Sequence, residues 1–459
     1  MIAKQSKKSV LTFMYSFLCF FLLSTLAFSQ GQKDIKLTPE LKAEVVEGVG
    51  KLLADNYIYT ETAKKMEEHI LQQLKEGKYN DVTNVDEFAR VLTQDLRSIS
   101  KDKHIRVGFS PEAVKSIRAR ESISEEEREK ERKERLEEAR QRNFSFQRVE
   151  IREGNIGYLD LRGFTGYPEA SETIIAAMNF LANANAVIID LRNNGGGSPF
   201  AIQIISSYFL EEHTHLNSFK WRHEDTIRQF WTERYVPGKK MYDTDLYILT
   251  SRRTFSAAEE FTYNLKNLKR ATIVGETTGG GAHPGGSRIV NDYFLVWVPS
   301  GRAINPITKS NWEGEGIEPH ISVPEEKALE KAHYTALEKL LEKTENETKK
   351  SRIQWSMDSI KARMNPIVIK ADILQKYVGR YSRGEIVLES GQLYFKVGPQ
   401  KLELIPLSET QFMIESQPNV RIEFIPDETG RKFDAKAYFI DGTDEVVKRI
   451  KKKEKSCSV

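Results

Sequence analysis

The chain has 459 residues, of which 69 are lysine or arginine and 66 are aspartate or glutamate, so its formal net charge at pH 7 is only +3. A charge this small gives no indication of a nucleic-acid partner or of an acidic one. The eight histidines are scattered, and the pair His213-x-His215 has no carboxylate or cysteine at ligand spacing, so we expect no metal; no organic cofactor is implied either. A chain of this length suggests roughly two to four domains.

The first segment, residues 1–29, has the pattern of a signal peptide. Three lysines precede an apolar run, Val10–Phe28, and small residues then predict cleavage before Gln30. We therefore expect an exported protein, periplasmic or secreted, in a bacterial envelope. The run is long for a signal peptide, and if uncleaved it would serve as a membrane anchor. Cleavage would leave Cys457 as the single cysteine, which excludes an intrachain disulfide.

Residues 30–109 are predicted to form a helical domain. A Thr38-Pro39 helix start is followed by apolar residues at helical spacing, and the same spacing returns over Ala63–Leu74 and Val85–Ile99. Residues 110–145 are dense in Glu, Lys and Arg with almost no apolar face, which indicates a solvated helical linker.

Residues 146–325 alternate short apolar runs with helical patterns, which predicts an α/β core around a sheet with parallel strands. Two runs have the composition of buried strands, Ala186–Asp190 and Leu246–Thr250. The first ends in the glycine-rich LRNNGGG. The second leads through a turn into a helical pattern over Ala257–Leu268.

Ser256 stands at the second strand-to-helix junction, where free backbone N–H groups and the helix dipole favour a developing anion. Its ordinary role there would be that of a helix N-cap. The glycines Gly195 and Gly196 allow backbone N–H groups to approach a ligand closely. We therefore predict a nucleophile, Ser256, and an oxyanion hole formed by Gly195, Gly196 and the Ala257 N–H.

Four motifs occur in a characteristic order: DLRNNGGG, TFSAAEEF, IVGETTGGGAHP and GEGIEPHISV. Together they resemble the tail-specific (C-terminal-processing) serine proteases, in the branch with tricorn core protease and interphotoreceptor retinoid-binding protein. The resemblance implies a ββα spiral core like those of crotonase and Clp protease, and a peptide or protein substrate. Many relatives use a lysine base twenty-five positions after the serine. Here that position is Gly281, so the base must come from elsewhere.

The resemblance implies that His104 is this base, because tricorn-like relatives take their catalytic histidine from a D-x-H segment at this place. Lys103 stands where those relatives have a serine, so either Asp102 or Glu313 could orient the imidazole. Glu313 matches the catalytic glutamate of the branch, and Glu315 is its neighbouring candidate. Without the resemblance, His104 would be a polar surface residue and Glu313 a solvated turn carboxylate.

After the core, residues 326–370 are predicted to form a helical connector and residues 371–453 a small antiparallel β domain. Short alternating runs separated by polar turns indicate a barrel or a sandwich. Its YVGRY opening resembles lipocalin-like modules, and the sequence does not indicate its ligand.

The whole pattern predicts an exported serine endopeptidase that acts through Ser256, His104 and Glu313 on unfolded or C-terminal peptide segments. The alternative is a non-catalytic protein that binds an apolar ligand or a peptide on the same scaffold. An esterase with the same nucleophile is a third possibility. The sequence does not indicate the oligomeric state.

Overall fold

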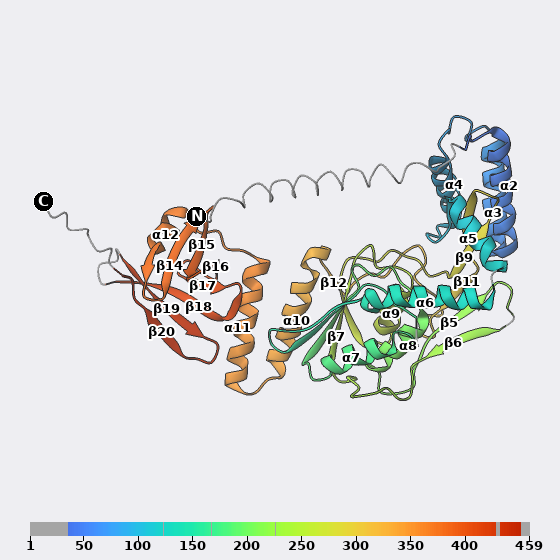
Figure 1. Ribbon diagram of the computed structural model, residues 1–459. Coiled ribbons are helices and arrows are strands. Elements are labelled where there is room, and N and C mark those ends of the chain that lie inside the picture. The colour runs from blue at the N-terminus through green and yellow to red at the C-terminus, as the bar shows by residue number, and fades with distance from the viewer. Residues whose placement is uncertain (1–34, 123, 167, 225, 428–431, 451–459) are drawn as a thin grey trace, which may run out of the picture. The chain divides into compact units, whose positions relative to one another are not determined.

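A computed structural model of the chain describes residues 35–122, 124–166, 168–224, 226–427 and 432–450 (Figure 1). The expected signal segment lies outside the described residues. Within them, no helix combines the length and the apolar character needed to cross a membrane. The chain divides into two compact units.

The first unit combines the described chain up to Lys101 with residues 105–121 and 285–299. Its helices are α2 (Pro39–Asn56), α3 (Thr60–Lys75), α4 (Val85–Ser100) and α5 (Pro111–Ser122), and its antiparallel sheet has the order β1 (Arg106–Phe109), β10 (Phe294–Pro299), β9 (Gly285–Ile289). The Thr38 hydroxyl caps α2 by accepting the Leu41 N–H at 3.3 Å. Apolar residues of α2, α3, α4, β1 and β10 share one core, so these helices and the sheet form a single body.

The second unit is built on a six-stranded sheet in the order β12-β8-β7-β4-β3-β2. The strands are β2 (Phe146–Arg152), β3 (Ile156–Leu161), β4 (Ala186–Asp190), β7 (Asp245–Thr250), β8 (Ala271–Gly275) and β12 (Ile321–Ser322). Only β2 runs antiparallel to its neighbour, and the other pairs are parallel. The predicted strands at 186–190 and 246–250 are thus confirmed as adjacent central strands.

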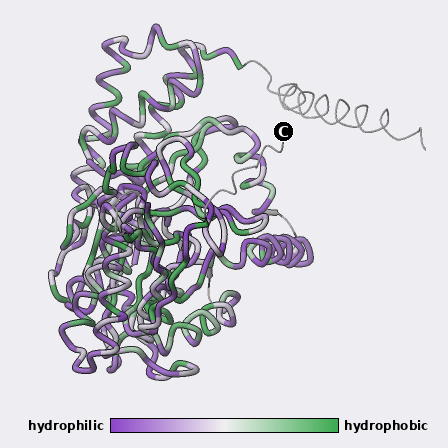
Figure 2. Tube along the Cα trace, turned by 90° about the vertical axis from the view of Figure 1, so that its left-hand side faces the viewer, coloured by the Kyte–Doolittle hydropathy of each residue, from purple (hydrophilic) through white to green (hydrophobic). Residues whose placement is uncertain are grey.

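Helices cover both faces of this sheet, which explains why its central strands are apolar throughout. In β4, Val187 and Ile189 pack under α7 (Ser171–Leu181), α8 (Pro199–Ser207) and α9 (Ala257–Asn267). Ile188 faces the opposite core with α10 (Ala328–Lys343) and α11 (Glu347–Met364). The predicted α/β class is confirmed. In Figure 2, hydrophobic stretches run through the interior of the molecule, and hydrophilic ones through outer helices and loops.

Smaller elements surround the main sheet. A three-stranded antiparallel sheet has the order β11 (Gly301–Ile304), β5 (His215–Trp221), β6 (Ile227–Trp231). Helix α6 (Glu125–Gln141), with no buried residue and a Ser124–Glu127 capping box, agrees with the solvated helix expected there. Short 3₁₀ turns lie at Asn143–Ser145 and Glu325–Lys327.

The C-terminal part of this unit is an eight-stranded antiparallel meander that is nearly closed into a barrel. After α12 (Ala371–Tyr377), its strands are β13 (Gly379–Tyr381), β14 (Gly384–Glu389), β15 (Gln392–Val397), β16 (Gln400–Pro406), β17 (Gln411–Ile414), β18 (Gln417–Pro426), β19 (Phe433–Phe439) and β20 (Asp444–Val447). Hydrogen bonds from Ser382 N to Lys448 O (2.9 Å) and from Ile450 N to Arg380 O (2.8 Å) join its two edges. Of the two predicted forms, the structure therefore has the barrel.

Candidate active site

Ser256 lies in a strained turn between β7 and α9. Its backbone has φ 54° and ψ −120°, a conformation that costs a non-glycine residue about 1–3 kcal/mol. The turn is held from below, because the buried Thr254 donates its hydroxyl to Leu191 O at 2.8 Å, and the Phe255 N–H reaches Asn194 O at 3.1 Å. A half-exposed hydroxyl is thus presented at the start of a helix.

The glycine loop after β4 passes directly beside this turn. Gly196 has φ 112°, and a Cβ there would lie 2.9 Å from Ser256 Cβ and 3.0 Å from Ala257 N. Only glycine can bring the backbone this close. The buried Asn194 fixes the loop, because its Oδ1 accepts the Gly196 N–H at 2.9 Å while its Nδ2 donates to Leu161 O. The structure therefore brings the predicted nucleophile and the predicted oxyanion loop together.

Glu259, which the sequence interpretation did not single out, ties the turn to a second loop. Its buried carboxylate accepts the N–H groups of Ser256 (2.9 Å), Gly280 (2.6 Å) and Gly281 (2.8 Å) and the Thr278 hydroxyl. Burial raises the pKa of Glu259, while these hydrogen bonds oppose the rise. Its position three residues after Ser256, at N3 of α9, was the signal for this role.

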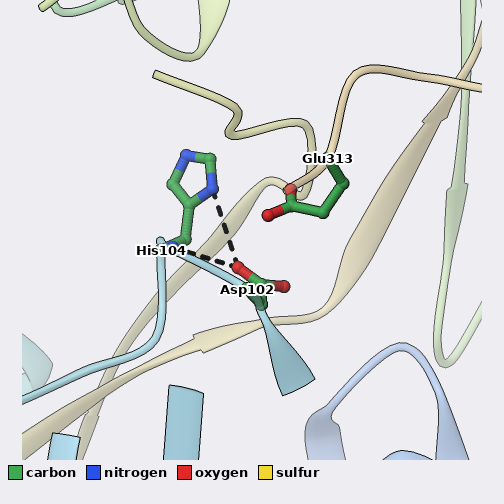
Figure 3. Close-up of side chains that lie close together, drawn as sticks. All are labelled: Asp102, His104 and Glu313. Atoms are coloured by element: carbon green, nitrogen blue, oxygen red, sulfur yellow. Dashed lines mark hydrogen bonds and ion pairs between the residues drawn. The ribbon is translucent and has the colours of Figure 1, made fainter. Parts of the chain in front are cut away.

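His104 and Asp102 come from the segment between α4 and β1, and both belong to the second unit. Asp102 is fully buried; its Oδ1 accepts the His104 backbone N–H at 3.0 Å and lies 3.9 Å from His104 Nδ1 (Figure 3). The His104 ring packs 4.6 Å from the ring of Phe255, the residue before Ser256. The predicted base therefore lies beside the nucleophile turn.

Glu313 points into the same cluster (Figure 3). Its Oε2 accepts the Ala282 N–H at 2.5 Å, and its Oε1 accepts the Lys103 N–H at 3.4 Å. The buried His283 lies between the two acids, with Nδ1 2.8 Å from Asp102 Oδ2 and 3.4 Å from Glu313 Oε2. Burial and the nearby charge of Asp102 raise the pKa of Glu313, and His283 opposes the rise.

The cluster contains more than the sequence predicted. His283 was visible only as part of the motif GGGAHP, and nothing in its local spacing marked it as a partner of two acids. Ligand atoms of Asp102, His104 and Glu313 lie within 4.8 Å of one another, so among the described residues these three could hold a cation. Their acceptor oxygens already receive backbone N–H groups and the His283 ring, an arrangement suited to moving a proton.

A cavity of about 250 Å³ opens at Ser256. One wall consists of Ser256, Ala257, Gly197 and Gly281. The remaining wall is predominantly aromatic and contains Phe200, Phe219, Trp221, Phe230 and Trp312. The cavity provides room for one large apolar side chain next to the nucleophile.

Comparison with known protein families gives two matches that together span well over half of the chain. Residues 155–323 match Peptidase family S41, and residues 25–148 match the N-terminal domain of Peptidase_S41 in eukaryotic IRBP. The first match contains Ser256 and Glu313, and the second contains His104.

Individual relatives match over shorter stretches. The chain is 32% identical over 128 residues to a carboxyl-terminal-processing protease of Picosynechococcus, covering 27% of this chain and 29% of the relative. It is 33% identical over 138 residues to the chloroplastic carboxyl-terminal-processing peptidase 2 of Arabidopsis thaliana, covering 27% and 24%. The chain thus spans less than a third of the length of these relatives. A putative peptidase structure from Parabacteroides merdae has 18% identity and a TM-score of 0.45, covering 64% of this chain and 96% of its own.

Proposed function

Because the chain belongs to peptidase family S41, we propose that it is an exported serine endopeptidase in which Ser256 is the nucleophile and His104 the general base. The observation that carries this proposal is the strained backbone of Ser256 beside the glycine loop. Strain of this kind persists where function requires a fixed geometry.

In this mechanism, Ser256 Oγ attacks the carbonyl carbon of a peptide bond while His104 accepts the hydroxyl proton. The C–N bond then breaks, and His104 returns the proton to the leaving amine. Water repeats the sequence on the acyl-enzyme and releases the carboxylic acid. The Ala257 N–H and an N–H of the loop Gly195–Gly197 bind the oxyanion. Since Asn194 already occupies the Gly196 N–H, we assign the loop donor to Gly195.

We assign to Asp102 the role of orienting the His104 ring. Glu313 supports the surrounding hydrogen-bond network. Asp102 contacts both the backbone and the ring of His104, whereas Glu313 reaches the cluster through Ala282, Lys103 and His283. An ionised acid beside the imidazole stabilises the imidazolium that forms during the reaction.

The proposal also includes export of the protein and action on C-terminal peptide segments. Export rests on the charged start, apolar run and small residues of the first 29 positions. Action on C-terminal peptide segments rests on the names of the relatives. Fractionation of the source cells and sequencing of the mature N-terminus would test export, and a cytoplasmic, uncleaved protein would contradict it.

Replacing the proposed nucleophile tests the activity. Ser256→Ala should remove turnover of an unstructured peptide while leaving the melting temperature nearly unchanged, because the side chain is half-exposed. Ser310→Ala, at an exposed serine of the same unit, is the matched control and should keep full activity. If Ser256→Ala retained turnover, or if the wild-type protein bound peptides without cleaving them, the proposal would fail in favour of the non-catalytic alternative.

A further inference from the structure

We propose that the cavity beside Ser256 binds the side chain of the substrate residue on the acyl side of the cleaved bond, and that Glu260 makes it select tyrosine. This inference rests on the proposed peptidase function. It adds a specificity-determining residue and a substrate class that the catalytic cluster alone does not define.

The position of the cavity identifies which substrate residue enters it. One wall includes Ser256, Ala257 and Gly197, so the cavity adjoins both the nucleophile and the proposed oxyanion donors. Those donors hold the carbonyl oxygen of the acyl residue. The side chain of that residue starts on the atom next to this carbonyl carbon, which places it at the mouth of the cavity.

The walls of the cavity suit a flat ring. Phe230 stands edge-on to Phe219, with ring centroids 5.4 Å apart at 89°, and lies 5.7 Å from Phe200 at 57°. Rings in such walls offer faces and edges to a further aromatic ring. A volume of about 250 Å³ is below that of typical pockets for small-molecule ligands, and fits a single large side chain.

Two ionisable residues lie in this largely aromatic lining, Glu260 and Arg228, and Arg228 is paired with Glu224. Glu260 lies one helical turn after Ser256, with its N–H bonded to Ser256 O at 2.9 Å, and it is only 4% exposed. Among the described residues no cation forms an ion pair with it. Burial raises the pKa of Glu260 to about 7, and the neighbouring buried Asn217 amide opposes the rise. A buried carboxyl without a charge partner is a costly feature to keep for packing alone.

A hydrogen-bond donor lies in the same lining. Trp221 borders the cavity, and its buried Nε1–H finds no acceptor within the described chain. Apart from the Arg228 guanidinium, which is paired with Glu224, the lining thus contains one carboxyl group and one indole N–H that a substrate could satisfy.

Counting donors and acceptors distinguishes the possible occupants. A tyrosine phenol brings one O–H donor and an acceptor oxygen, which match Glu260 and Trp221 one to one. A guanidinium or an ammonium group would place a second cation beside Arg228, which also lines the cavity, so like-charge repulsion disfavours Arg and Lys as occupants. Phenylalanine fills the space but brings no polar group to the carboxyl group or the indole N–H, and sites built for a hydroxyl strongly reject analogues that lack it.

The test compares quenched-fluorescent peptides that differ only in the acyl-side residue, which is Tyr, Phe, Lys, Arg or Ala, with the full-length enzyme at a fixed pH. We expect kcat/KM for Tyr to exceed that for Phe by about tenfold or more, with Lys and Arg lower still. Glu260→Leu and Trp221→Phe should each bring the Tyr and Phe peptides to within a few-fold of each other. Glu318→Gln, at an exposed acid, should leave the ratio as in the wild type.

Wild-type preference for Phe, Lys or Arg would overturn the inference, and so would Tyr preference that survives in both variants. A second measurement needs no turnover. It compares the rates at which a tyrosine-derived phosphonate ester and its phenylalanine analogue label the serine, and the ratio of these two rates should show the same preference for Tyr. Failure of the underlying function has a different signature, since neither hydrolysis of any peptide nor labelling of Ser256 would then occur.

Discussion

At the scale of single residues, the site depends on groups that position other groups. Lys103 Nζ donates to Gly279 O at 2.5 Å, which ties the histidine segment to the glycine loop 279–281. Asp102 receives donors on both oxygens, from the His104 N–H and from His283 Nδ1. Replacement of Lys103 or His283 would therefore act on the geometry of His104.

Two acid-to-amide substitutions separate the roles in the cluster. Asp102→Asn should lower kcat by roughly 10³–10⁴-fold, because the amide neither stabilises the imidazolium nor holds the same imidazole tautomer. Glu313→Gln should cost far less, since Glu313 lies farther along the network. Single-turnover kinetics on one peptide would measure both, with Glu315→Gln at an exposed neighbour as the control. A Glu313→Gln variant as inactive as Asp102→Asn would return the orienting role to Glu313.

Glu260 should also change how the free energy of unfolding depends on pH. Its folded-state pKa of about 7 lies above the ordinary value of 4.5, so between these pH values the folded state binds more protons than the unfolded state. The free energy of unfolding therefore falls as pH rises from 4.5 through 7, by roughly 3 kcal/mol from this group. Glu313 acts in the same direction.

The corresponding measurement is the melting temperature between pH 4.5 and 8. The melting temperature of the Glu260→Gln variant should fall less over this range than that of the wild type, and it should be the higher of the two at pH 8. The melting temperature of Glu318→Gln should change with pH as that of the wild type does. Identical curves for Glu260→Gln and the wild type would show that the Glu260 carboxyl group is not buried as described.

Among the helices and strands, local sequence patterns predicted the elements whose formation depends on the local spacing of apolar residues. The helices expected over Ala63–Leu74 and Val85–Ile99 are α3 and α4, and the strand expected over Leu246–Thr250 is β7. The placing of Ser256 at a strand-to-helix junction followed from the same patterns. Contacts between distant segments could not be predicted this way. The approach of Asp102 to His283, 181 positions later, has no local signature.

The loop from Thr278 to Ala282 shows why contacts between distant segments could not be predicted from the sequence. Hydrogen bonds hold it to Glu259, Lys103 and Glu313, which come from three separate segments. Its glycines could be read as a flexible turn, but their function is close packing. A Cβ at Gly281 would lie 2.2 Å from the Phe255 ring and 2.6 Å from His104 Cε1.

Gly281→Ala therefore tests whether the loop sets the position of the base. We expect the added methyl group to displace the His104 ring and to lower kcat/KM by about 100-fold, the effect of misplacing a catalytic group by about 1 Å. Gly286→Ala, where a methyl group would meet nothing within 4 Å, is the matched control and should retain activity. Full activity in Gly281→Ala would show that this packing does not constrain His104.

At the scale of the whole molecule, the first unit is discontinuous in sequence. Its core combines helices from before residue 101 with Phe294, Val296 and Val298, which are at most 1% exposed. The pairing of β10 with β1, across almost 190 residues, has no local signal in the sequence. The helical domain expected from the sequence ends at residue 109, whereas the core of the first unit also includes residues of β10.

A fragment limited to residues 30–121 should therefore fail to fold cooperatively, because it lacks the three buried β10 side chains, each of which stabilises the core by about 1.5–3 kcal/mol. The same fragment with residues 285–299 attached through a flexible linker should regain a cooperative thermal transition in circular dichroism. A sharp transition in the shorter fragment would contradict the shared core.

The most direct test of the central claim, that Ser256 is a nucleophile activated by His104, is mass-spectrometric mapping of a fluorophosphonate adduct on the full-length protein. We expect a single major adduct on the tryptic peptide that contains Ser256, formed rapidly in the wild type and at least 100-fold more slowly in His104→Ala. An adduct on another serine, or equal labelling rates in the two proteins, would contradict it.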